Sequence, residues 1–195
     1  TRDPRHLESA LLLEDYHDSH FWDNRSGGYF TSPVSATDLF ARKKEFADGA
    51  IPSPNSVSFY NLVRLGLLTG EEKYSRRADA LSRLYSPLVE NGPASCGLFM
   101  AGFTLSRGPA TRVVVTGKET DPAFLAMNEF LDHHYLPFTI PVSLEHGKDE
   151  ELFFRLAPSL APHRFAGEAA VAHVCTRSSC APPAFSVEDL SARLG

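Results

Sequence analysis

The feature of this sequence that decides its fold is a polar passage running straight into an apolar segment: Arg42–Ser56, RKKEFADGAIPSPNS. Acidic, basic, hydroxyl and amide side chains crowd a stretch in which two prolines and a glycine favour turns. The residues that follow predict a helix over 55–68, because apolar side chains cover most of its circumference. Only Ser58, Asn61 and Arg64 interrupt them, at intervals of three that form one thin stripe. A helix of this kind is buried, so the polar loop attached to it is a candidate site.

Helical periodicity extends to both sides of this passage. We predict further helices over residues 4–18, 71–86 and 94–106. The helix over 71–86 has one apolar stripe opposite a charged face. A buried helix, a short turn at Thr69–Gly70 and an amphipathic helix are typical of the inner and outer helices of a layered α/α structure. Between Phe21 and Phe30, the stretch Asn24–Gly28 predicts a tight hairpin turn, because glycine supplies positive φ angles.

The pattern changes after Arg107–Pro109. Three short runs predict strands over 112–117, 139–144 and 169–175, and Pro141 indicates that the second lies at an edge or contains an irregularity. Helices are predicted over 122–134, where Asp121 and Pro122 form a start signal, over 150–160, and from Ser186 onward. Strands that alternate with helices favour a small, largely parallel three-stranded sheet. We therefore expect a mainly α chain with a small α/β part, divided into helical hairpins over 1–108 and an α/β subdomain over 109–195.

Composition excludes several classes of function. The 195 residues are 43% hydrophobic and 22% charged, with a formal net charge of −5, which is ordinary for a globular chain. No basic cluster favours nucleic acid, and no apolar run is long enough to span a membrane. The chain starts at Thr1 with no initiator Met and no signal-peptide pattern. We expect a fragment or processed chain of the cytoplasm, in which three cysteines do not form a secreted disulfide scaffold.

The polar passage supplies the first candidate site. Asp48 is the candidate catalytic residue, as a general base or as an acceptor for a sugar hydroxyl, and Ser53 and Asn55 would orient the ligand. The same residue types are also typical of helix starts. In that alternative Ser53 or Asn55 caps the buried helix, and Asp48 fixes the turn through backbone N–H groups.

The aromatic residues around the predicted hairpin supply a second candidate. Trp22 could stack on a sugar ring while Asp23 accepts hydrogen bonds from its hydroxyl groups. Aromatic residues beside a hairpin are also typical core residues, and this alternative stays open.

Cys175 and Cys180 are the redox candidates. Their x4 spacing, with His173 nearby, differs from the usual zinc patterns, and the sequence offers no obvious fourth ligand. A reversible disulfide is therefore favoured over a metal site. We expect neither a metal nor a cofactor.

Several short stretches, taken in order, carry a family resemblance: Phe21–Asp23, Gly27–Phe30, Asp48–Ala50, Pro52–Ser53, Asn55–Ser56, Leu67–Gly70, Val174–Cys175 and Cys180–Pro183. They resemble the C-terminal part of large thioredoxin-domain-containing proteins, the bacterial relatives of the spermatogenesis-associated thioredoxin-like protein. The resemblance covers essentially the whole chain, but only the last part of the family's length. Pro54 departs from it, because the family usually has a small residue there.

The resemblance implies part of a six-hairpin (α/α) toroid, similar to N-acylglucosamine 2-epimerases and toroidal glycosidases. It implies a fragment of an epimerase- or glycosidase-like protein that supplies one wall of a carbohydrate pocket. Two alternatives stay open. One is a non-catalytic scaffolding module that self-associates or binds the missing N-terminal toroid and thioredoxin-like domain. The other is a thiol-redox role through Cys175 and Cys180. The sequence leaves open whether the chain is an enzyme.

Overall fold

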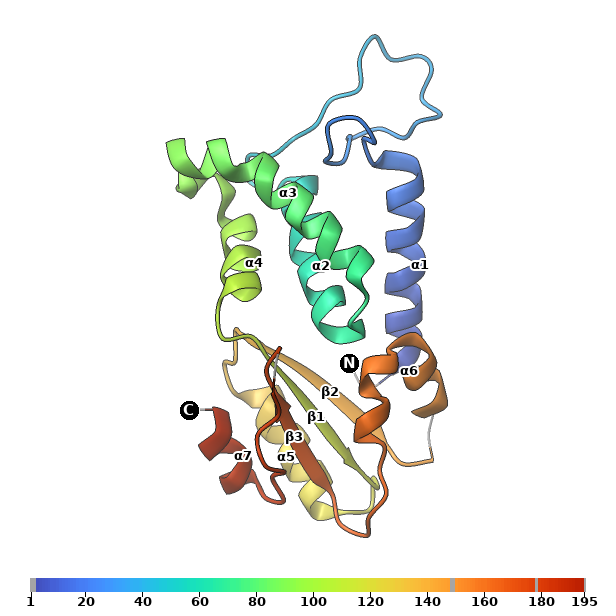
Figure 1. The fold of residues 1–195 in the computed structure, drawn as a ribbon, viewed down its shortest axis with the longest axis vertical. Coiled ribbons are helices and arrows are strands. Elements are labelled where there is room, and N and C mark those ends of the chain that lie inside the picture. The colour runs from blue at the N-terminus through green and yellow to red at the C-terminus, as the bar shows by residue number, and fades with distance from the viewer. Residues whose placement is uncertain (1–2, 148–149, 178, 195) are drawn as a thin grey trace. The chain divides into compact units, whose positions relative to one another are not determined.

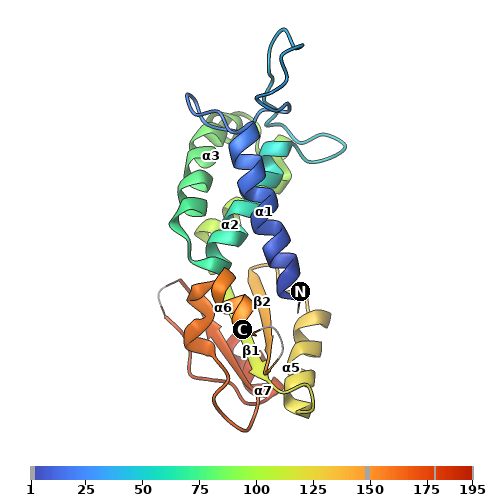
Figure 2. The same cartoon turned by 90° about the vertical axis from the view of Figure 1, so that its right-hand side faces the viewer.

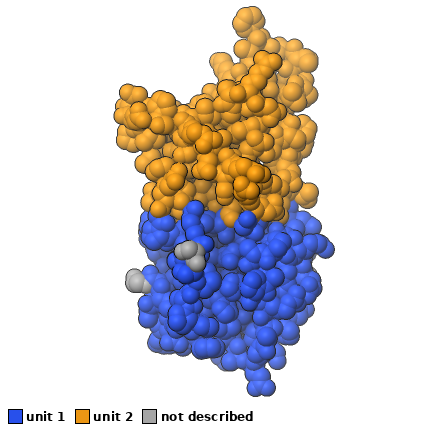
Figure 3. All heavy atoms as spheres, viewed as in Figure 1, with its two compact units in different colours: residues 1–8, 67–70, 108–195 blue, residues 9–66, 71–107 orange. Residues whose placement is uncertain are grey.

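The structure is a computed structural model, and it describes residues 3–147, 150–177 and 179–194. The chain divides into two compact units (Figure 3). The helical unit comprises residues 9–66 and 71–107. The α/β unit comprises residues 1–8, 67–70 and 108–195.

The helical unit is built from antiparallel and crossing helices joined by one long irregular loop (Figure 1). Its elements are α1 (Pro4–Phe21, whose first residues belong to the α/β unit), α2 (Pro54–Thr69), α3 (Glu72–Asn91), the 3-10 helix η1 (Pro93–Cys96) and α4 (Gly97–Arg107). All four predicted helices are therefore confirmed, with small differences at their ends. The predicted tight turn is confirmed too, since Gly27 and Gly28 have φ angles of 75° and 79°.

Aromatic side chains form the centre of the helical unit. The Phe99 ring of α4 lies 4.3 Å from the ring of Phe59 on α2 and 3.9 Å from that of Tyr85 on α3, measured between centroids. Each of these side chains is at most 1% exposed. Gly102 lets α4 approach α2 closely, because a Cβ at this position would lie 3.0 Å from the Phe59 ring. The Ser56 hydroxyl of α2 also lies 2.8 Å from the Tyr85 hydroxyl of α3. The predicted burial of α2 therefore follows from contacts with both α3 and α4.

The α/β unit contains a three-stranded sheet in the order β2-β1-β3. Its elements are β1 (Thr111–Gly117), α5 (Pro122–His133), β2 (Thr139–Glu145), α6 (Glu150–Leu156), the 3-10 helix η2 (Pro158–His163), β3 (Val171–Cys175) and α7 (Val187–Leu194). β2 lies at an edge and Pro141 is exposed there, as predicted.

The prediction of a largely parallel sheet is wrong. β1 and β2 are parallel, but β3 pairs with the other edge of β1 in the antiparallel direction. The chain after β3 then folds back on it, and Ala172 and Ala184 exchange both backbone hydrogen bonds. The β-branched pattern that indicated a strand is the same for either direction, so it could not decide this point.

The two faces of this sheet have different environments. Val113 and Val115 of β1 face an apolar core with Phe124 and Met127 of α5 and Leu190 of α7; Figure 2 shows α5 along this side. Because side chains alternate along a strand, Arg112 and Val114 lie on the opposite face. Their partners in register on β3 are Cys175 and His173. This opposite face carries the polar and sulfur-containing side chains discussed below.

None of the helices in the described part of the chain has the length and apolar character needed to cross a membrane. The toroid arrangement of the helical unit stays a prediction.

Candidate functional site

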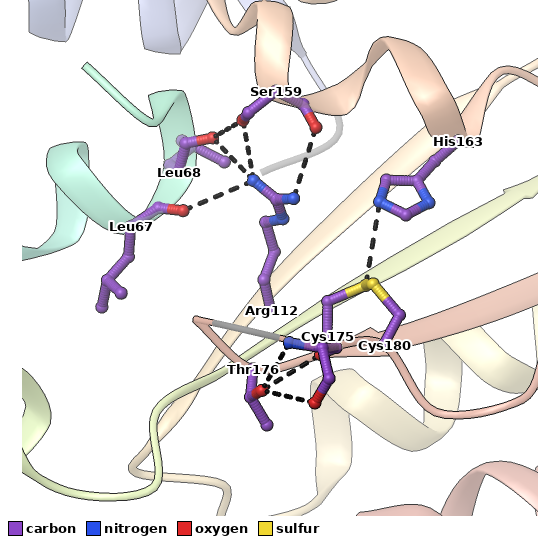
Figure 4. Close-up of a disulfide and its surroundings, with 9 residues drawn as sticks. Leu67, Leu68, Arg112, Ser159, His163, Cys175, Thr176 and Cys180 are labelled. Carbon is purple, nitrogen blue, oxygen red and sulfur yellow. Dashed lines mark hydrogen bonds between the residues drawn. A yellow bond between two sulfur atoms is a disulfide. The ribbon is translucent and has the colours of Figure 1, made fainter.

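Cys175 and Cys180 are joined by a disulfide at the end of β3 (Figure 4). They face each other as an antiparallel bridge, with Cα atoms 3.9 Å apart. Backbone hydrogen bonds from Ala181 to Val174 and from Thr176 to Ser179 flank the pair. Cys175 is 3% exposed, whereas Cys180 is exposed. One sulfur of the pair is thus accessible, and the other belongs to a buried strand.

His163, the last residue of η2, lies beside the disulfide (Figure 4). Its Nε2 atom is 3.8 Å from Sγ of Cys175, and its ring centroid is 4.7 Å from that of His173. Burial is the main cause that lowers the pKa of His163 to about 4, and His173 and Arg112 lower it further. The imidazole next to the sulfur is therefore neutral at neutral pH. Sequence reasoning connected His173 with the cysteines but missed His163, which no local pattern links to them.

Arg112 holds η2 in the position that places His163 there. Its guanidinium donates hydrogen bonds to the Ser159 hydroxyl at 2.7 Å and to the Leu68 carbonyl at 3.3 Å (Figure 4). The Ser159 hydroxyl also donates to the Leu68 carbonyl, at 2.9 Å. Burial lowers the pKa of Arg112 from its ordinary value. The Arg112 guanidinium thus links three elements by hydrogen bonds: β1, which carries it, the end of α2 and η2.

Asp48, the candidate catalytic residue, uses both carboxylate oxygens in backbone contacts. Oδ1 accepts from the Ser53 N–H at 2.9 Å and Oδ2 from the Leu98 N–H at 2.8 Å. Partial burial alone would raise its pKa, but these hydrogen bonds outweigh it and lower the pKa below the usual value. The carboxylate therefore joins the loop before α2 to the first turn of α4.

Ser53 and Asn55 are buried parts of the same local structure. The Ser53 hydroxyl oxygen accepts from the Ser56 N–H at 3.1 Å, which makes Ser53 the cap of α2, with Pro54 in the first helical position. Asn55 is 0% exposed and makes two hydrogen bonds to the backbone of Tyr29 and one to the Glu45 carbonyl. The capping alternative therefore accounts for Ser53, and Asn55 fixes two loops to the helix.

Trp22 and Asp23 lie in the loop that precedes Tyr29, and both have partners outside that loop. The Trp22 ring lies 4.1 Å below the Arg77 guanidinium and 4.9 Å from the Tyr29 ring. The Asp23 carboxylate accepts from Lys44 Nζ and the Ser26 hydroxyl, both at 2.6 Å. The Lys44 ammonium is the largest cause that holds the pKa of Asp23 well below its usual range. Each of these groups has a partner within the protein.

A buried carboxyl group, Glu14, was not among the predicted site residues. It is 8% exposed and lies 3.1 Å from the Tyr29 hydroxyl, which donates at 2.6 Å to Asp18 one turn further along α1. Asp18 in turn accepts from Arg77 at 2.9 Å. Burial is the main cause that raises the pKa of Glu14 to about 7. Its position on the apolar side of the first helix was the sequence signal for this residue.

Glu14 predicts a pH dependence of stability. A raised pKa in the folded state stabilises the fold below pH 4.5, and this contribution is lost as the pH rises through about 7. The change reaches between about 3 and 4 kcal/mol, since the pKa rises from 4.5 to about 7 and one pKa unit corresponds to about 1.4 kcal/mol. Urea unfolding at several pH values should show that Glu14→Gln removes this loss.

The control for this prediction is Glu72→Gln, an exposed carboxyl of α3. His17, whose pKa burial lowers, acts in the opposite direction. Asp15, Asp18, Lys73 and Tyr29 are the other titratable groups around Glu14, and all are kept in both variants. An identical pH profile for wild type and Glu14→Gln would contradict the prediction.

The sequence of this chain is similar to those of several known proteins over more than nine-tenths of its length. Spermatogenesis-associated protein 20 of Homo sapiens is 30% identical over 178 residues, which cover 91% of this chain. The chain is homologous to a segment of spermatogenesis-associated protein 20. The protein of the same name from Mus musculus is 29% identical over the same length, and an uncharacterized protein of Caenorhabditis elegans is 25% identical over 185 residues. No family model matches the chain.

The homology supports the family link that the sequence motifs suggested. The chain spans only 22% of the human protein and 25% of the nematode protein, so it corresponds to a minor part of either. The names of these relatives describe no reaction. The carbohydrate-pocket prediction for Asp48, Ser53, Asn55, Trp22 and Asp23 is untested by these comparisons and stays a prediction.

Proposed function

We propose that Cys175 and Cys180 form a thiol–disulfide redox centre of the α/β unit. The observation that carries the proposal is the disulfide itself, in which an exposed Cys180 is bonded to a buried Cys175 with an imidazole 3.8 Å away. Thiol–disulfide exchange needs one sulfur that a partner can reach and a leaving sulfur that the protein stabilises. Cys180 is the sulfur that a partner can reach, and Cys175, buried beside His163, is the leaving sulfur.

The reaction partner in this proposal is a dithiol. One of its thiolates attacks Sγ of Cys180, the Cys175–Cys180 bond breaks, and Cys175 leaves as a thiolate that then takes a proton. The second thiolate attacks the partner's own sulfur in the mixed disulfide and releases Cys180, which is also protonated. The dithiol is oxidised to a disulfide, and two electrons and two protons reach the cysteine pair. The reverse sequence reduces a partner disulfide.

His163 serves the buried half of this exchange. Its Nε2 atom is close enough to Sγ of Cys175 for a weak hydrogen bond to the leaving sulfur. Arg112 keeps η2 in place through Ser159. The exposed Cys180 is thus the sulfur that the partner thiolate attacks, and the buried Cys175 is the sulfur that leaves.

Thiol titration with a chromogenic reagent tests the proposal. Air-exposed wild-type protein should show no reactive thiol from the pair, and treatment with excess dithiothreitol under native conditions should release two. Cys180→Ser and Cys175→Ser should each abolish oxidation of a small dithiol, because neither variant can form the disulfide. With a small disulfide as the partner, Cys175→Ser should form a mixed disulfide through the exposed Cys180 and should not complete the exchange. Cys96→Ala is the control, because Cys96 is free and buried. Free Cys175 and Cys180 in air-exposed protein, or a pair that never exchanges, would refute the redox role.

We also propose that the helical unit is part of an (α/α) toroid in the longer protein. The sequence of a buried α2, a turn at Gly70 and an amphipathic α3 supports this arrangement.

A further inference from the structure

Three potential metal ligands come together at the disulfide. The Cys175 and Cys180 sulfurs and a ring nitrogen of His163 all lie within 4.8 Å of one another. The three residues come from β3, from the segment that follows it and from η2, so the fold brings them together. In the described part of the chain, the Cys175 sulfur is the only side-chain hydrogen-bonding partner of the His163 ring.

We propose that the reduced pair and His163 bind Zn²⁺, and that oxidation to the disulfide removes the site. Two thiolates and one imidazole are ligands that Zn²⁺ prefers. The disulfide sulfurs carry no negative charge, so the oxidised pair cannot act as thiolate ligands. This inference rests on the proposed redox function in one respect: both require that the Cys175–Cys180 disulfide can be reduced.

The dimensions of the cluster fit this ion. Zn–S bonds of about 2.3 Å and Zn–N bonds of about 2.1 Å place the nitrogen and sulfur of a tetrahedral site about 3.6 Å apart. The distance between Nε2 of His163 and Sγ of Cys175 is 3.8 Å. The two sulfurs must move apart once their bond is broken, to about 3.8 Å in such a site. Cys180 is exposed and lies outside β3, so it can supply most of this movement.

Among the described residues three side chains form the cluster, so in our proposal the fourth coordination position is taken by a water molecule or a partner's ligand. Cys175 and His163 are 3% and 8% exposed, which gives the site a buried wall. The exposed Cys180 forms the side that an ion can approach. Three protein ligands with a fourth position open are typical of zinc sites that exchange ligands, in contrast to closed structural sites.

Metal titration of the reduced full chain tests the inference. The protein is kept in a phosphine reductant throughout purification, and Zn²⁺ binding is measured by competition with a chromogenic chelator. We expect one Zn²⁺ per reduced chain, and affinity lower by on the order of 100-fold or more after oxidation. His163→Gln should weaken binding at least about tenfold. His133→Gln, which changes an exposed histidine of α5, and Cys96→Ala should leave affinity unchanged.

Co²⁺ provides a second measurement that needs no variant. Its charge-transfer absorption should show thiolate coordination in the reduced wild-type chain and none in the oxidised chain. Equal Zn²⁺ affinity in the two redox states, or in wild type and His163→Gln, would overturn the inference. The thiol count in the same samples reports separately on the redox function: a pair that exchanges with dithiol yet binds no Zn²⁺ refutes the metal site alone.

Discussion

Replacing Asn55 with alanine should lower the free energy of unfolding by about 3 kcal/mol. The side chain is 0% exposed and makes three hydrogen bonds: Oδ1 accepts from the Tyr29 N–H at 2.7 Å, and Nδ2 donates to the Tyr29 and Glu45 carbonyls at 2.9 and 2.8 Å. Alanine would remove all three and leave buried backbone groups unpaired, which costs more than the net value of the bonds.

Urea unfolding measures this effect, and the only tryptophan gives a local signal. Trp22 lies 4.9 Å from the Tyr29 ring, so its fluorescence should report loosening of the loop that Asn55 holds. Asn61→Ala on the exposed side of α2 is the matched control and should change stability by less than about 0.5 kcal/mol. Equal stability of the two variants would show that the Asn55 contacts contribute little.

Asp48→Asn should destabilise the helical unit by about 2 kcal/mol at neutral pH, with partial exposure limiting the effect. The carboxylate accepts from the Ser53 and Leu98 N–H groups, and an amide can present only one oxygen to these two donors. The asparagine NH₂ group would then face one of these two backbone N–H groups. One hydrogen bond is lost, and two N–H donors are placed against each other.

The pH dependence of the Asp48 effect has a defined sign. Because the pKa of Asp48 is lowered in the folded state, its contribution is present above pH 3.8 and is lost as the pH falls through the folded-state pKa. The stability difference between wild type and Asp48→Asn should therefore narrow in acid. Asp38→Asn, an exposed acid in the long loop, is the control. If Asp48→Asn is as stable as wild type, the carboxylate has no structural role and the catalytic prediction gains support.

Local sequence was a good guide to individual elements. The apolar run after Asn55 predicted α2 because a helix that is apolar nearly all round must be buried. The Asp121–Pro122 start signal predicted α5, and the Asp121 carboxylate does accept from the Ala123 N–H at 2.9 Å. These features depend on residues within a few positions of one another, so the sequence alone contains the information.

Contacts between residues that are far apart in the sequence could not be predicted from local patterns. The second carboxylate oxygen of Asp121 accepts a hydrogen bond from the Ala170 N–H at 2.7 Å, and the two residues are 49 positions apart. No local sequence pattern predicts this hydrogen bond. The antiparallel direction of β3 was missed for the same reason, since strand propensity does not depend on the partner's direction.

The sequence by itself determined the elements, the polar passage before α2 and the two cysteines that form the candidate centre. The tertiary structure decided what those polar groups do. It gave Asp48 and Asn55 backbone partners and placed Glu14 beside the Tyr29 hydroxyl. It also brought His163 to the cysteine pair. The physical reason is that propensity and capping act over a few neighbouring residues, whereas burial and donor–acceptor pairing depend on which segments the packed chain brings together.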